Sequence, residues 1–242
     1  MNNKFIISTQ TFASQCDKNQ TLRHDAILSI FQDLATAHSI EMKVDHNTLK
    51  ERSNAFWVIT KLKFKTVGKI CHNEPVTLET WPLKPDLIRY LRDFHISAKN
   101  GEIHGSSEWC MLDYKNQTIR RLNTVCYPVD LIHEQKRADV TPFLRLNEQT
   151  DESNLSYRYK AVLSDIDMNG HVNNVSYAKM ALNAFSLDEF YSLSYNAFEI
   201  HFISQCYFGD EICIYKKTVG DNIFIDGKVN GKQVFKCLFY NE

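Results

Sequence analysis

One short segment groups residue types that could take part in acid–base chemistry. It reads DIDMNGHVNNVSY over residues 165–177, and Asp167, Asn169 and His171 alternate in it with other residues. An imidazole can give and take a proton near neutral pH, a carboxylate can orient that imidazole, and an amide can hold a carbonyl oxygen. The segment is therefore our first candidate for a site at which an acyl carbonyl is attacked.

The same segment also matches part of a calcium-binding loop. Asp165, Asp167, Asn169 and Gly170 stand at positions 1, 3, 5 and 6 of such a loop. Position 12 is Ser176, which cannot supply the two oxygens of the usual glutamate. The preceding residues YRYKAVLS alternate like a strand, whereas a calcium loop lies between two helices. We therefore favour acyl chemistry here and expect no metal.

A helix is expected to follow the segment, with apolar residues from Val172 to Phe185 near one face. Asp and Asn side chains before a helix commonly cap it, and Asp167 or Asn169 alone fits that role. The segment also contains His171, Asn173 and Asn174, which are more polar side chains than a helix cap requires. Free N–H groups near Val172, at the positive end of the helix dipole, would also stabilise an oxyanion.

The elements that must position this segment come in two similar sets. The first set is a strand-like start, a helix near residues 22–41, and the strand-like runs FWVITKLKFKTV, PVTLETW, RYLRDFHISA and SSEWCMLDY. After a polar, proline-containing stretch the second set follows: LSYRYKAVLS, the motif, the second helix, and the runs AFEIHFIS, EICIYKK, NIFIDGKV and QVFKCLFY. We predict one unit over residues 1–130, a linker over 131–154 and a second unit over 155–242.

The two units align by residue type, which indicates a tandem duplication of one α+β unit. DKNQTLRH at Asp17 matches DMNGHVNN at Asp167, and Asn100-Gly101 matches Asn230-Gly231, where tight turns are expected. In each unit a long helix is expected to bury its apolar stripe against an antiparallel sheet. Thr21 stands where the second unit has His171, so only the second unit offers a group that titrates near neutral pH.

Composition limits the class of protein. The chain has 242 residues, 43% of them apolar, and a formal net charge of −1, so no global basic field would attract nucleic acid or a membrane surface. We expect no signal peptide at MNNKFIISTQTF and no transmembrane helix. The seven cysteines form no CxxC pair, and no Cys/His spacing is typical of zinc. A reduced, cytoplasmic protein without a metal or cofactor is expected.

The layout and SDIDMNGHVNNVSY together resemble the acyl-acyl carrier protein thioesterase family of plants and bacteria. FWVITKLKF, VTLETWPL, YLRDFHI and GSSEWCMLDYKNQTIRRL are similar to the family's N-terminal repeat in order and spacing, so the resemblance covers nearly the whole chain. It implies a tandem double hot-dog fold and hydrolysis of fatty acyl-acyl carrier protein to free fatty acid and carrier protein. It also implies that most of the acyl pocket lies in the first unit.

The resemblance further implies that Asp167, Asn169 and His171 are catalytic, since their types and spacing match the family's motif. The family has an acid followed by cysteine on a strand after the helix, and here FISQCYFGDE places Gln205 and Cys206 at these positions. Glutamine cannot act as a general base, so Asp167 or His171 would have to activate the water. Cys206 as a nucleophile with His171 as base is an alternative chemistry, although free cysteines usually serve packing.

Other functions stay open at this point. They are an acyl-CoA thioesterase, a hot-dog hydratase acting on an enoyl thioester, and an acyl binder whose catalysis has decayed. An acidic carrier protein would require a basic patch, for which Lys84, Arg89 and Arg92, or Lys136 and Arg137, are candidates. Two fused units could pair their sheet edges internally, so either a monomer or a homodimer is compatible with the sequence.

Overall fold

The computed structural model describes residues 3–131 and 137–242. The chain divides after Val140 into two compact units. The predicted linker 131–154 falls partly outside the described residues. The first strand of the second unit begins at Leu155, where the second repeat is predicted to begin.

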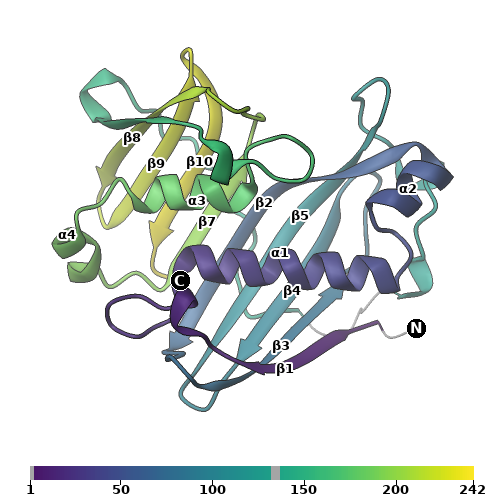
Figure 1. The fold of residues 1–242 in the computed structure, drawn as a ribbon, viewed down its shortest axis with the longest axis horizontal. Helices are drawn as coiled ribbons and strands as arrows, with labels where there is room; N and C mark the ends of the chain where they lie inside the picture. The colour runs from purple at the N-terminus through teal and green to yellow at the C-terminus, as the bar shows by residue number, and fades with distance from the viewer. Residues whose placement is uncertain (1–2, 132–136) are drawn as a thin grey trace. The chain divides into compact units, whose positions relative to one another are not determined.

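The first unit is an antiparallel sheet with a long helix on one face (Figure 1). Its strands lie in the order β1-β3-β4-β5-β2, and each neighbouring pair is antiparallel. Its elements are β1 (Phe5–Gln10), α1 (His24–Glu41), α2 (His46–Ser53), β2 (Ala55–Gly68), β3 (Pro75–Pro82), β4 (Tyr90–Ser97) and β5 (Gly101–Asp113), with 3-10 turns at Ala13–Gln15, Leu122–Thr124 and Val129–Leu131.

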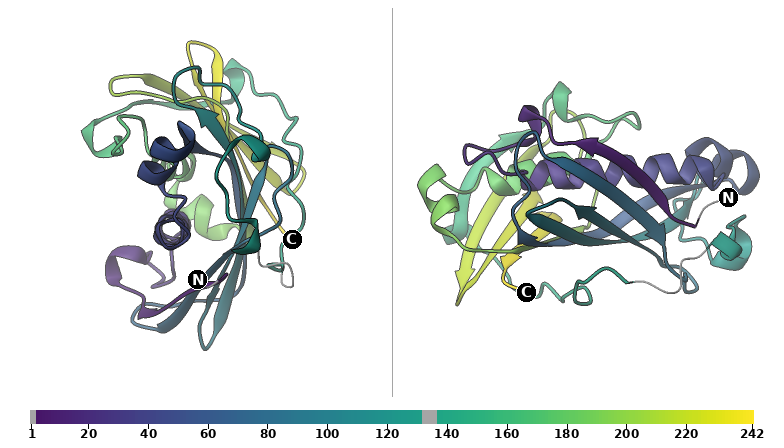
Figure 2. Two further views of the ribbon diagram at one scale, coloured as in Figure 1. Left: turned by 90° about the vertical axis from the view of Figure 1, so that its right-hand side faces the viewer. Right: turned by 90° about the horizontal axis from the view of Figure 1, so that it is seen from below.

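Helix α1 buries the apolar stripe that its 3.6-residue spacing predicts. Ile27, Phe31 and Leu34 are all buried, and the ring of Phe31 stacks on Phe94 of β4 with centroids 4.3 Å apart. Gly105 of β5 permits this close approach, because a Cβ at that position would lie 2.1 Å from the Phe31 ring. In Figure 2 the helix is seen end-on against the face of the curved sheet.

The second unit repeats this plan with shorter helices. Its sheet has the order β7-β10-β9-β8-β6, again antiparallel throughout, and α3 packs on β9 and β10. Its elements are β6 (Leu155–Lys160), α3 (Asn174–Leu182), α4 (Leu187–Ser192), β7 (Ala197–Phe202), β8 (Glu211–Val219), β9 (Asn222–Val229) and β10 (Lys232–Tyr240), with 3-10 turns at Glu152–Asn154 and Leu163–Asp165.

The helix of the second unit is shorter than the long helix that the sequence predicts. α3 has 9 residues, against 18 in α1. The chain starts a separate helix, α4, because the Ser186 side chain caps it by accepting from the N–H of Glu189 at 3.2 Å. Helices α2 and α4 are short and weakly patterned, so they were not predicted from the sequence.

The two predicted hairpin turns differ in backbone geometry. Asn230 and Gly231 both have positive φ, 49° and 76°, as the tight turn predicted between β9 and β10 requires. In the first unit the turn closes through the N–H of Ala98, which donates to the carbonyl of Gly101 at 2.9 Å. Within the described residues, no helix is long and apolar enough to cross a bilayer.

Candidate active site

The motif forms a tight turn that leads into α3. The carboxylate of Asp167 accepts hydrogen bonds from the N–H groups of Asn169 at 2.8 Å and of His171 at 3.3 Å. The N–H of Asp167 in turn donates to the carbonyl of His171 at 2.8 Å. A short acid that binds the next backbone N–H groups is a standard way to stabilise such a turn. Asp167 therefore fixes the backbone from which His171 projects.

The first unit contains the same turn without the imidazole. The carboxylate of Asp17 accepts from the N–H groups of Asn19 and Thr21, each at 2.9 Å, and the N–H of Asp17 donates to the carbonyl of Thr21 at 2.9 Å. The hydroxyl of Thr21 also donates to the second carboxylate oxygen at 3.0 Å. The duplication predicted from residue types thus extends to individual hydrogen bonds. Histidine at position 171 lacks the hydroxyl that binds the second carboxylate oxygen in the first unit.

The imidazole of His171 lies beside Tyr207, on the connection between β7 and β8. The two ring centroids are 5.2 Å apart and the rings are inclined by 67°. His171 is partly exposed, and Tyr207 is 52% exposed. The imidazole is therefore open to solvent on one side, as a group that exchanges protons with water or substrate must be.

The N–H of Val172 is not available for an oxyanion, contrary to the expectation for this position. It donates to the carbonyl of Cys206 at 2.9 Å, and the next N–H, of Asn173, donates to the carbonyl of Asp165 at 2.7 Å. The Asn173 side chain caps α3 by accepting from the N–H of Val175 at 2.8 Å. No hydrogen bond from the Asn174 N–H to another described residue is found, so this is the first-turn donor that remains.

Two amide side chains near the turn point to the surface. Asn169 and Gln205 are both exposed. The Asn169 amide donates to Asp167 only at 3.5 Å, the long limit for a hydrogen bond, so it can turn toward a ligand at little cost. Gln205 directly precedes Cys206, whose backbone is bonded to the motif through Val172.

Cys206 is a packing residue in this geometry. Its side chain is 0% exposed, and its backbone N–H donates to the hydroxyl oxygen of Tyr177 at 2.9 Å. Burial raises the pKa of the Cys206 thiol. Because the thiolate is the nucleophilic form, both observations oppose attack by this cysteine.

The carboxylates of the motif do not gather as calcium ligands would. Asp165 binds the Val162 N–H and the Tyr159 hydroxyl, each at 2.9 Å, while Asp167 binds its own turn. Strand β6 precedes the turn, as the alternation predicted, so the helix that a calcium loop needs on this side is absent from the described residues.

The basic residues proposed to contact a carrier protein differ in exposure: some lie on the surface and one lies in the core. Arg92 is buried, where its guanidinium bonds to His38 Nδ1 at 2.9 Å and Thr80 Oγ1 at 3.2 Å, so its place in a surface patch was predicted wrongly. Strand alternation turns it toward α1. Lys84 and Arg89 are exposed. Among the second pair, Arg137 binds Asp93 at 3.1 Å, and Lys136 lies outside the described residues.

Three groups near the motif were not predicted from the sequence. They are Tyr207 beside the imidazole, Tyr177 under Cys206, and the N–H of Asn174. Tyr177 falls on the buried face of α3, where an aromatic residue would be taken for packing alone. Tyr207 lies in a loop, so no periodicity indicated its place.

Comparisons with known proteins find family matches in both units. The family model described as acyl-ACP thioesterase N-terminal domain matches residues 2–127, and the model described as acyl-ACP thioesterase C-terminal domain matches residues 147–238. The chain belongs to the acyl-ACP thioesterase family. The family resemblance found in the sequence is thereby confirmed.

Solved structures share the fold of this acyl-ACP thioesterase family member. An acyl-ACP thioesterase from Bacteroides thetaiotaomicron has a TM-score of 0.89 at 20% identity and covers 99% of this chain and 98% of its own. A 12:0-ACP thioesterase from Umbellularia californica has a TM-score of 0.85 at 13% identity, with coverage of 99% and 97%. The predicted α+β double hot-dog fold is confirmed.

Curated relatives are longer than this chain. An oleoyl-acyl carrier protein thioesterase of Arabidopsis thaliana is 26% identical in an alignment of 187 positions that covers 69% of this chain and 50% of the relative. A chloroplastic palmitoyl-acyl carrier protein thioesterase of Gossypium hirsutum is 25% identical in an alignment of 172 positions that covers 64% of this chain and 39% of the relative. The chain thus spans half or less of the length of these relatives.

Proposed function

We propose that this chain hydrolyses the thioester of fatty acyl-acyl carrier protein, releasing free fatty acid and the carrier-protein thiol. One observation carries the proposal: in a chain whose two halves match the two domains of the family, a partly exposed imidazole stands on a fixed turn at a helix start. The matching turn of the other repeat has threonine there. A single reaction centre, in the second repeat, follows from this asymmetry.

In the proposed mechanism His171 moves the proton. It takes a proton from water as the water oxygen attacks the thioester carbonyl, and it gives that proton to the sulfur as the carbon–sulfur bond breaks. The Asn169 amide and the Asn174 N–H stabilise the negative oxygen formed in between. The carboxylate of Asp167 accepts from the backbone N–H of His171 at 3.3 Å, which orients this residue, and its charge would polarise the attacking water.

Gln205 would position the water by hydrogen bonds alone. Its amide cannot accept a proton at neutral pH, so the base is His171 or, through the water, Asp167. We leave Cys206 out of the chemistry because its thiol is buried and its pKa is raised. Its carbonyl keeps a structural role through the bond to Val172.

We propose that the first repeat holds most of the acyl chain. Its support is an aromatic cluster around Tyr90, whose ring centroid is 4.9 Å from that of Trp57 and 5.0 Å from that of Tyr127. Such walls suit an apolar tail.

The direct test is an assay of thiol release. Purified protein would be given acyl-carrier and acyl-CoA thioesters of short, medium and long chains, and free thiol would be followed over time. We expect release from a long-chain carrier thioester, with the CoA thioester a weaker substrate. Addition of water to an enoyl thioester without thiol release would instead identify a hydratase. Stoichiometric acyl binding without turnover would identify a decayed site.

Partner and location are also proposals. The exposed Lys84 and Arg89 are the described residues that we assign to the acidic carrier protein. Arg89 binds Asp86 at 2.7 Å, so part of its charge is already neutralised. All seven cysteines are free, which supports a reducing compartment such as the cytoplasm.

A further inference from the structure

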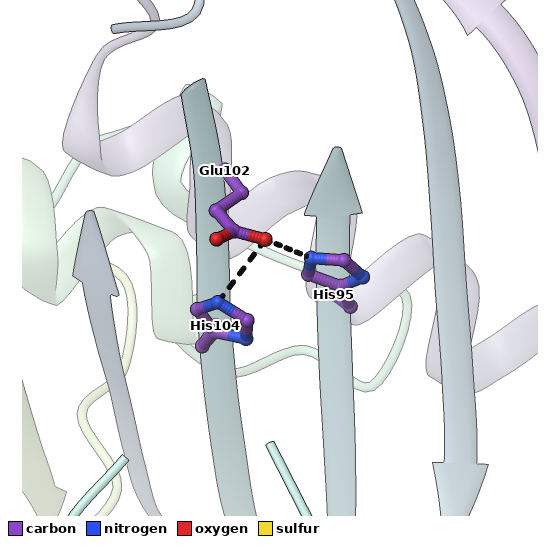
Figure 3. Close-up of side chains that lie close together, drawn as sticks. All are labelled: His95, Glu102 and His104. Atoms are coloured by element: carbon purple, nitrogen blue, oxygen red, sulfur yellow. Dashed lines mark hydrogen bonds and ion pairs between the residues drawn. The ribbon is translucent and has the colours of Figure 1, made fainter. Parts of the chain in front are cut away.

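Two histidines and a glutamate gather on the sheet of the first unit, outside the motif of the second. His95 of β4 and His104 of β5 are directly paired across the strands, and Glu102 precedes His104 by two residues on the same face. Figure 3 shows the three side chains pointing toward one another. In the described residues this is the one group of three or more His, Cys, Asp or Glu side chains whose ligand atoms converge.

Their distances fit a small divalent ion. One oxygen of Glu102 lies 2.9 Å from His95 Nε2 and 3.4 Å from His104 Nε2, and all three ligand atoms lie within 4.8 Å of one another. Zinc bonds of about 2.0 Å in a tetrahedron place ligand atoms about 3.3 Å apart. The two nitrogen–oxygen separations lie on either side of that value, so small side-chain rotations are enough to enclose an ion.

A second carboxylate orients one of the histidines. Glu79 of β3, which is paired with His95 across the strands, binds His95 Nδ1 at 3.0 Å. This bond holds the ring in the orientation that turns Nε2 toward Glu102. Metal-binding histidines usually have such a partner on their other nitrogen. Lys4 in turn forms an ion pair with Glu79, which holds that carboxylate in place.

We propose that His95, Glu102 and His104 bind a zinc ion, with water as the fourth ligand. Two imidazoles and one carboxylate, without sulfur, suit Zn²⁺ and not Mg²⁺ or Ca²⁺, which take oxygen ligands. The histidine side chains are 13% and 14% exposed, and that of Glu102 is 42% exposed, so an ion can enter from solvent. The neighbouring cation Lys65 is bonded to Asp139 at 2.8 Å, which reduces its repulsion of the ion.

The inference does not depend on the proposed hydrolysis. The three ligands lie on β4 and β5 of the first unit, while His171 lies in the second. The bound ion would join two adjacent strands near their hairpin, and its expected effect is stabilisation of the first unit.

The test is a zinc titration of the full chain without a polyhistidine tag, after treatment with a chelator. Calorimetry should give one Zn²⁺ per chain, and Co²⁺ as a substitute should give the intense visible absorption of a tetrahedral site. His95→Gln, Glu102→Gln and His104→Gln should each weaken binding by at least tenfold. Glu79→Ala removes the orienting bond, together with the ion pair to Lys4, and should weaken binding by about 10–100-fold.

The matched control is His201→Gln. His201 also pairs with a carboxylate, that of Glu199 at 2.6 Å, and is about as exposed as His95, but it belongs to no three-residue cluster in the described part of the chain. This variant should bind zinc like the original protein. Zinc should also raise the melting temperature of the original protein and not that of His104→Gln. Absence of stoichiometric binding, or equal affinity in His104→Gln, would show that the cluster is only a hydrogen-bonded surface network.

Discussion

The Oδ1 atom of Asp167 accepts a hydrogen bond from the backbone N–H of His171 at 3.3 Å. The acid therefore holds the main chain of the motif, and no bond from it to the imidazole is found among the described residues. Asp17 binds the N–H of Thr21 in the same way. Both repeats therefore contain the turn, and only the second has the imidazole.

Replacing His171 with alanine should lower kcat strongly and leave KM nearly unchanged. General acid–base catalysis contributes about 10²–10⁴-fold, and the side chain makes no hydrogen bond within the described structure whose loss would disturb the fold. Steady-state kinetics on a long-chain acyl-carrier thioester measures the effect. Thr21→Ala, at the matching turn of the first repeat, is the control and should keep kcat. Full turnover in His171→Ala would refute the assignment.

The charge of Asp167 can be separated from its structural role by Asp167→Asn. The amide oxygen of asparagine can still accept from the N–H groups of Asn169 and His171, so the melting temperature should change little. We expect kcat to fall about tenfold or more, because the neutral amide no longer polarises the attacking water as the carboxylate does. Asp17→Asn makes the same change in the first repeat and should not alter kcat. If kcat of Asp167→Asn equals that of Asp17→Asn, the charge of Asp167 has no part in catalysis and the residue only stabilises the turn.

Gln205→Ala should reduce kcat by about tenfold, which corresponds to one lost hydrogen bond to the attacking water. Gln205→Glu restores an acid at this position and should raise kcat above that of the original protein. It should also add a rate decrease at low pH, where the new carboxylate becomes protonated. The pH profile of kcat for the three proteins is the measurement. Identical profiles would remove Gln205 from the proposed mechanism.

Cys206→Ala should keep turnover within about twofold and lower the free energy of unfolding by about 1 kcal/mol, because a buried side chain is shortened. Cys237 is equally buried, on β10, and Cys237→Ala should give the same combination of results. Urea unfolding and the thiol-release assay give both quantities. Loss of turnover in a folded Cys206→Ala protein, with Cys237→Ala active, would identify Cys206 as the nucleophile.

Acid should destabilise the first unit through His24, the first residue of α1. Burial lowers the pKa of His24 from 6.5 to about 4, and its ring packs edge-on against Phe64 at 5.2 Å. The unfolded chain therefore binds a proton at His24 at a higher pH than the folded chain does. The free energy of unfolding is unaffected by His24 above pH 6.5 and decreases as the pH falls from 6.5 toward 4. We expect a loss on the order of 2 kcal/mol.

Urea unfolding at a series of pH values measures this loss. His24→Gln should flatten the dependence between these limits. The control is His46→Gln, which changes an exposed histidine of α2 and should leave the pH dependence of unfolding as it is in the original protein. An unchanged slope in His24→Gln would assign the acid sensitivity to other groups.

The sequence by itself determined the order of the elements, the duplication and the motif. These features depend on local information: the period of apolar residues, the residue types that tight turns require, and the short spacing of Asp167, Asn169 and His171. Helix α1 and the nine strand-like runs after the first strand were predicted in this way. The short helices α2 and α4 were not, because each has too few turns to show a period.

The tertiary structure decided which groups are free to act. Val172 and Cys206 are 34 residues apart, yet a bond between their backbones removes one oxyanion donor. Burial makes Cys206 a packing residue and turns Arg92 away from the surface. The register of β4 and β5 places His95 beside His104. Contacts between distant segments depend on register and packing, which the residues of one segment do not specify.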